Sequence, residues 1–186
     1  MKRPARVVTA FLVACGAGGL ATLASSMTAC SVEFTEADGG IRATTILAPD
    51  QSAFTTVSPV LEKRCGTLDC HGQVGRPLRI YSGNGLRLPV DGGGIPGSSP
   101  TTQDEVTANY RAVIGLEPEE LTRVVAGEDP PRSLLLLKKP LLLEAHKGGP
   151  AFAPVNDPGE TCITSWVDPN SPGIDKNACN QAIAGF

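Results

Sequence analysis

Hydrophobic residues recur at helical spacing in several short segments of the chain, and turn-forming residues separate these segments. Val106 and Tyr110 fall on one helical face, and Thr102 and Glu105 have the spacing of a capping box, in which the two residues cap each other across the first turn. This pattern predicts a helix that begins after Thr102 and ends at Gly115.

Further helices are predicted from the same signals, a capping residue or proline at the start and an apolar stripe behind it. Ser58 followed by Pro59 is typical of a helix start, so the first helix is expected to run from there to Cys65. The other predicted helices span residues 118–127, 133–138 and 157–167. Between them, residues 77–81 alternate as in an extended segment, and residues 91–100 are typical of a loop.

The composition favours a small, loop-rich domain that needs covalent cross-links. Gly and Pro supply 21 and 16 of the 186 residues and aromatic residues only 4%, which argues against a helical bundle or a large sheet enzyme. Hydrophobic residues, at 41%, are nonetheless too frequent for a disordered chain. The net charge of −3 disfavours nucleic acid as a partner, since phosphate binding requires a basic surface.

Residues 1–29 have the layout of a bacterial signal peptide. A basic start, with Lys2, Arg3 and Arg6, precedes an apolar stretch over residues 7–24, and no acidic residue occurs before Glu33. The alternative is a transmembrane anchor, because the stretch approaches the roughly 20 residues that a span requires. Its three glycines make it a poor permanent span, so we expect it to be removed.

The end of this segment, Met27-Thr28-Ala29-Cys30, resembles the cleavage box of bacterial lipoproteins. We therefore expect Cys30 to carry a lipid and to hold the protein at a membrane of the cell envelope, on the periplasmic or the surface-facing side. Residues 30–54 are mostly polar or small and are interpreted as a linker. The domain is expected over residues 55–186.

Four of the six cysteines remain once Cys15 leaves with the signal and Cys30 is lipidated. An even number in an exported chain indicates covalent cross-links, either disulfides or a thioether-bound cofactor. Cys162 lies in the last predicted helix and Cys179 in the polar tail, so we expect a disulfide between them that pins the tail.

The heptapeptide Cys65-Gly66-Thr67-Leu68-Asp69-Cys70-His71 carries the most specific chemistry in the chain. Two cysteines with a histidine directly after the second are the signature of c-type haem attachment. The cysteines form thioethers with the haem vinyl groups, and the adjacent imidazole binds the iron. The usual motif has two residues between the cysteines; this chain has four, a spacing found in some multihaem cytochromes.

From residue 55 to about residue 170, the chain resembles the cytochrome-c-like domains of bacterial exported proteins. The resemblance is carried by a short first helix, Cys65, Cys70, His71, Gly72, Ser133-Leu134-Leu135, His146, Gly148-Gly149 and Trp166. It implies a small all-α domain with long Gly/Pro-rich loops, in which the first and last helices pack together. It also implies covalent haem c, one-electron transfer with a redox partner protein, and no enzymatic activity of its own.

Haem iron held by His71 has a sixth position, which Met or His usually fills in cytochromes c. Met1 and Met27, the only methionines, both lie in residues 1–29, so His146 is the remaining residue of the usual kinds. The glycines at 148 and 149 would let the backbone approach the haem edge. Three arginines are candidates to pair with the haem propionates: Arg76, Arg79 and Arg87.

Two alternatives use the same residues without haem. Cys65 and Cys70 could form a local disulfide in a structural or interaction lipoprotein that has no cofactor. Alternatively, the two cysteines with His71 and His146 make a Cys₂His₂ zinc set, although the adjacent Cys70 and His71 would struggle to share one ion. Hydrolytic catalysis has little support, since the chain has only two histidines and no Gly-x-Ser-x-Gly motif.

Overall fold

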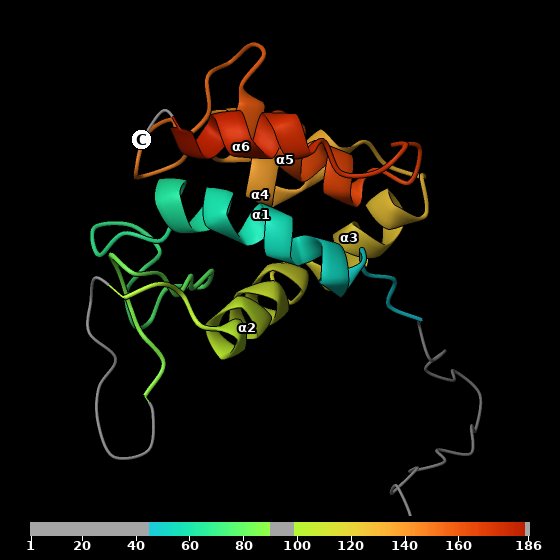
Figure 1. Cartoon of the computed structure of the whole chain (residues 1–186). Helices are drawn as coiled ribbons and strands as arrows, with labels where there is room; N and C mark the ends of the chain where they lie inside the picture. Colours follow the sequence, from blue (N-terminus) through green and yellow to red (C-terminus); the bar gives the residue numbers. More distant parts are fainter. Residues whose placement is uncertain (1–44, 90–98, 185–186) are drawn as a thin grey trace, which may run out of the picture. The chain divides into compact units, whose positions relative to one another are not determined.

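A computed structural model describes residues 45–89 and 99–184 (Figure 1). These residues form α1 (Gln51–Arg64), α2 (Gln103–Ile114), α3 (Pro118–Val125), a 3₁₀ helix (Pro131–Ser133), α4 (Leu135–Lys138), α5 (Pro158–Val167) and α6 (Lys176–Ala184). The described part of the chain has no strand, which confirms the all-α prediction. None of its helices has the length and apolar character needed to cross a membrane. The predicted signal peptide, Cys30 and residues 31–44 of the predicted linker lie outside the described residues, as do residues 91–98 of the predicted loop.

α1 begins upstream of its predicted start at Ser58 and Pro59, so that prediction is wrong. Asp50 caps the helix instead, because its side chain accepts a hydrogen bond from the Ser52 backbone N–H at 2.9 Å. Pro59 lies inside α1, where it removes one helical hydrogen bond. The buried face of α1 outweighs that cost; it consists of Phe54, Val57, Val60 and Leu61. Residues 51–54, placed in the linker by the sequence analysis, therefore belong to a core helix.

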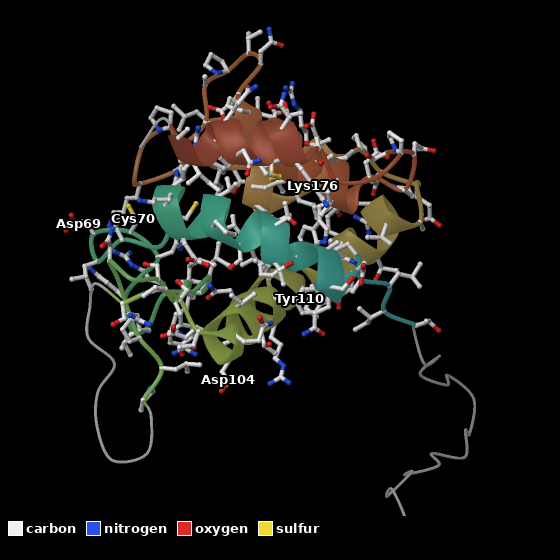
Figure 2. The ribbon with its side chains drawn as sticks, in the orientation of Figure 1. Asp69, Cys70, Asp104, Tyr110 and Lys176 are labelled. Atoms are coloured by element: carbon white, nitrogen blue, oxygen red, sulfur yellow. A yellow bond between two sulfur atoms is a disulfide. The ribbon has the colours of Figure 1, made fainter. Side chains whose placement is uncertain are left out.

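The core lies where α1 packs against α2 on one side and against α5 and α6 on the other (Figure 1). Phe54 of α1 contacts the rings of Tyr110 and Trp166, with centroid distances of 5.5 and 5.0 Å. Tyr110, seen on α2 in Figure 2, donates its hydroxyl to the Pro49 carbonyl, and the Trp166 indole N–H donates to the Asp50 carbonyl. The expected packing between the first helix and the helix that holds Trp166 is therefore present.

The C-terminal tail forms α6, a helix that the sequence analysis does not predict. Ala178, Cys179 and Ala182 are buried along one face, and the Asp175 side chain accepts from the Ala178 backbone N–H at 2.9 Å. The predicted disulfide between Cys162 and Cys179 is confirmed and joins α6 to α5. The buried face of α6 was missed because it is made of small residues, which give a weak hydrophobic pattern.

The remaining helix predictions agree with the structure to within a few residues. The capping box of Thr102 and Glu105 is confirmed, with both reciprocal hydrogen bonds present. Asp157 caps α5 by accepting from the backbone N–H groups of Gly159 and Glu160. The Glu160 side chain instead forms an ion pair with Arg132, so this start is not a reciprocal capping box. Residues 77–81 make no strand; Tyr81 forms only an isolated bridge with Leu86.

Candidate functional site

The heptapeptide Cys65–His71 follows α1 directly and folds into a tight loop. Cys65 is the first residue after the helix, and the His71 backbone N–H donates to the Cys65 carbonyl at 2.8 Å. Gly72 closes the loop, because a Cβ at that position would lie 2.3 Å from the Gly66 carbonyl oxygen. The loop brings Cys65, Cys70 and His71 together at the C-terminal end of α1; Cys70 is labelled there in Figure 2.

Hydrogen bonds to the backbone that follows the loop fix the position of His71. The His71 backbone carbonyl accepts from Ile80 N–H at 2.9 Å, and the ring Nδ1 lies 2.8 Å from the Leu78 carbonyl oxygen. Burial lowers the pKa of His71, the hydrogen bond to Leu78 partly opposes this, and the neighbouring His146 and Arg76 lower it further. His71 is therefore neutral at pH 7, with Nδ1–H donating to Leu78 and the Nε2 lone pair available to a metal.

His146 reaches the same place from the loop between α4 and α5, 75 residues later in the sequence. Its Nδ1 lies 2.7 Å from the Gly149 carbonyl oxygen, and the Gly149 N–H donates back to the His146 carbonyl at 3.0 Å. This tight turn requires a positive φ of 75° at Gly149, which favours glycine. The turn at Gly149 therefore orients the His146 ring, a role that the residue pattern did not reveal.

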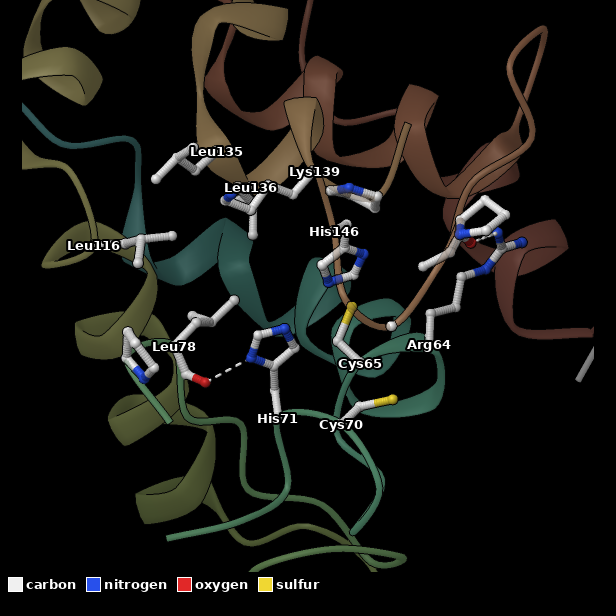
Figure 3. Close-up of a pocket in the computed structure, with 15 residues that line it drawn as sticks. Arg64, Cys65, Cys70, His71, Leu78, Leu116, Leu135, Leu136, Lys139 and His146 are labelled. Carbon is white, nitrogen blue, oxygen red and sulfur yellow. Dashed lines mark hydrogen bonds between the residues drawn. The ribbon is translucent and has the colours of Figure 1, made fainter. Parts of the chain in front are cut away.

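The two imidazole rings face each other across a gap (Figure 3). Their planes are within 11° of parallel and their centroids are 6.2 Å apart. A metal bound by two imidazole nitrogens lies about 2 Å from each, which separates the ring centres by about 6 Å when the rings point at the metal from opposite sides. In both rings Nδ1 is hydrogen-bonded to a backbone carbonyl. Metal-bound histidines commonly make such a bond with the ring nitrogen that does not bind the metal.

The histidines line a cavity of about 420 Å³ whose wall is largely apolar. Both cysteines of the heptapeptide lie on this wall. In Figure 3 they stand on one side of His71, with the Cys65 thiol directed toward the space between the two rings. The apolar part of the wall includes Leu78, Leu116, Leu135, Leu136, Pro140 and Pro150.

Cys65 and Cys70 are not bonded to each other in this structure. The disulfide that the cofactor-free alternative expects between them is therefore not found. Burial, together with the neighbouring Cys70, raises the pKa of the Cys65 thiol to about 12. In the described ranges no group of three or more His, Cys, Asp or Glu side chains is placed to hold a metal ion.

The three arginines proposed for the haem propionates do not share one environment. Arg87 forms a buried ion pair with Glu105, with Nε to Oε1 at 2.8 Å, and this disfavours the role proposed for it. Arg76 and Arg79 are exposed beside a second cleft, which Pro77 shares with the cavity of the histidines. Arg111 of α2 lines that cleft too; the sequence analysis missed it because helical spacing gave no sign of its proximity to residues 76–79.

No family model, curated protein or solved structure is significantly similar to this chain. The resemblance to cytochrome-c-like domains therefore remains a prediction that rests on the residues themselves. The structure brings together all four residues that the haem hypothesis requires: Cys65, Cys70, His71 and His146.

Proposed function

We propose that this protein is a monohaem c-type cytochrome that transfers single electrons and is held at a membrane of the cell envelope by a lipid on Cys30. The observation that carries the proposal is the pairing of His71 and His146, with near-parallel rings 6.2 Å apart across an apolar cavity. Cys65 and Cys70 stand on the wall of that cavity. Bound haem would supply reversible one-electron chemistry at its iron.

The residues of the cavity fit this cofactor in three respects. His71 and His146 each direct a ring nitrogen into the gap from opposite sides (Figure 3), and no methionine outside residues 1–29 competes with them. The two cysteines offer thiols on one side of the pair, where thioethers would fix the macrocycle covalently. The leucines and prolines of the wall exclude water, and this limits the reorganisation of solvent when the charge of the site changes.

The protein sets the potential of the site through its ligands and its burial. Two histidines lack the thioether sulfur that raises the potential of Met/His cytochromes, so the potential is expected to be comparatively low. The Leu78 and Gly149 carbonyls accept from the two Nδ1–H groups and make both rings stronger donors, which favours the oxidised iron. We expect the redox partner to be a protein whose own reduction potential is similarly low.

The proposal is tested by producing the chain in a bacterial host that has a haem-attachment system. We expect a red protein whose haem remains bound through denaturation and whose peptide mass places the thioethers on Cys65 and Cys70. The matched control is Cys65→Ala/Cys70→Ala, which keeps both histidines and should lose its haem on denaturation. A colourless wild-type product from a host that attaches haem to another cytochrome would reject the proposal in favour of a cofactor-free lipoprotein.

A further inference from the structure

A second cleft, of about 580 Å³, lies next to the cavity of the histidines and is lined by three arginines. Arg76 and Arg79 come from the segment after His71, and Arg111 comes from α2. All three side chains are exposed, and none pairs with a carboxylate among the described residues. In a chain of net negative charge, three cations around one cleft form an electrostatic site for an anion.

The position of this cleft relative to the cysteines suggests which anion it would bind if haem occupies the cavity of the histidines. Pro77 lines both cavities, and Leu78 and Leu116 directly follow residues of the cleft, Pro77 and Gly115. Figure 3 shows Leu78 and Leu116 on the side of His71 away from Cys65 and Cys70. In the haem macrocycle the vinyl groups and the propionates lie on opposite edges, so haem bound by the two cysteines through its vinyl groups turns its propionates away from them.

The geometry points to Arg76, Arg79 and Arg111 as the site that binds the two haem propionates. This inference rests on the proposed function. Guanidinium groups bind carboxylates through paired N–H donors. Three guanidinium groups and two propionates together would leave a net charge of only +1. The Arg79 guanidinium lies 5.6 Å from the centre of the Tyr81 ring, which keeps it directed along the cleft wall. Arg87, engaged by Glu105, is replaced in this role by Arg111.

The test compares haemin with haemin dimethyl ester, whose propionates carry no charge. Both are titrated into the mature chain with Cys65→Ala/Cys70→Ala, so that binding is non-covalent and a low-spin Soret band reports ligation by the two histidines. We expect this parent to bind haemin about tenfold more tightly than the ester, since charge-assisted hydrogen bonds are lost with the ester. Adding Arg76→Gln, Arg79→Gln and Arg111→Gln should remove this preference and leave the affinity for the ester within about twofold.

A charge-matched control carries Gln at three cations that line neither cavity: Lys63, Arg123 and Lys176. It should keep the preference for haemin, which excludes an effect of net charge alone. Unchanged affinity for the ester also shows that the triple variant is folded. A parent that binds both compounds equally, or an arginine variant that keeps the preference, would overturn the inference while leaving the proposed function intact. Failure of the parent to bind either compound would count against both.

Discussion

Arg64 and Asp157 form a buried ion pair that joins the end of α1 to the start of α5. The guanidinium Nη1 lies 2.9 Å from both carboxylate oxygens and also donates to the Ala151 carbonyl at 3.0 Å. Burial by itself would raise the pKa of Asp157, but hydrogen bonds from Ala153 N–H, Arg64 and Gly159 N–H outweigh it and lower that pKa. The pair lies beside the cavity of the histidines, since Arg64 is part of the cavity wall.

Removing one member of this pair should destabilise the whole domain. Asp157→Ala leaves the Arg64 charge buried without its carboxylate and also removes the cap of α5, so we expect a loss of about 3 kcal/mol or more. Urea denaturation followed by circular dichroism measures this loss. Glu120→Ala is the control, because its partner Arg123 is half exposed and an exposed ion pair contributes little to stability, so the loss should be much smaller. Equal losses in the two variants would show that burial of the ion pair contributes nothing.

Because of the Glu105–Arg87 ion pair, we expect the free energy of unfolding to fall at acid pH. Burial opposes ionisation of Glu105, but hydrogen bonds from Arg87, Thr102 and Leu88 lower its pKa to about 2. A carboxylate with a depressed pKa binds protons more readily in the unfolded chain, so its contribution is present above the unfolded pKa of about 4.3. That contribution is lost as the pH falls from about 4.5 to 2. Urea midpoints measured over this range should fall steeply for the wild type and less steeply for Glu105→Gln.

The control for this titration is Glu119→Gln, an exposed position on α3. Its midpoints should follow the pH dependence of the wild type. If Glu105→Gln also retained the full acid dependence, Glu105 would not be the group responsible.

The Cys162–Cys179 disulfide should account for much of the stability of α6. The bond closes a loop with a sequence separation of 17, for which the loop-entropy model gives about 3 kcal/mol. Cys179→Ala should therefore lower the free energy of unfolding by about that amount and make the C-terminal segment sensitive to protease. Peptide mass spectrometry without reduction should recover the 162–179 cross-link from the wild type. Two free thiols there, or an unchanged unfolding midpoint, would contradict this.

Local patterns predicted much of this molecule, because several elements depend on neighbouring residues alone. The capping box of Thr102 and Glu105 is such a short-range feature, and the sequence indicated it correctly. Ser58 and Pro59 also looked like a helix start, yet the long-range packing of Phe54 determined where α1 begins. Motifs thus specified local conformation, whereas tertiary contacts determined which of two possible residues begins the helix.

The candidate site combines residues that sequence spacing cannot relate. His146 was selected only because no methionine was left, and its orientation depends on a turn at Gly149. Arg111 was not selected at all, since its place beside Arg76 follows from the packing of α2 against the loop. The pairing of distant residues therefore required the fold, although their chemistry was readable from the sequence.

The lipid proposed for Cys30 gives a prediction about where the protein is found. Cys30→Ala cannot receive the lipid, so the variant should be released from the membrane fraction or accumulate with residues 1–29 uncleaved. Fractionation and the mass of the intact protein measure this, with Cys15→Ala as the control because that cysteine lies in the segment to be removed. Unchanged membrane partition and unchanged mature mass in Cys30→Ala would contradict lipidation at this residue.

His146 provides a sharp test of the proposed haem site, because in that proposal only His146 and His71 bind the iron. If haem is bound as proposed, His146→Ala removes one of its two strong-field ligands, so the spectrum should change from low-spin to high-spin and the reduced iron should bind carbon monoxide. The thioethers at Cys65 and Cys70 should still retain the haem. Lys147→Ala is the matched control, since this neighbour is exposed and does not line the cavity. If the spectrum and the binding of carbon monoxide are unaltered in His146→Ala, the ring that faces His71 is not an iron ligand.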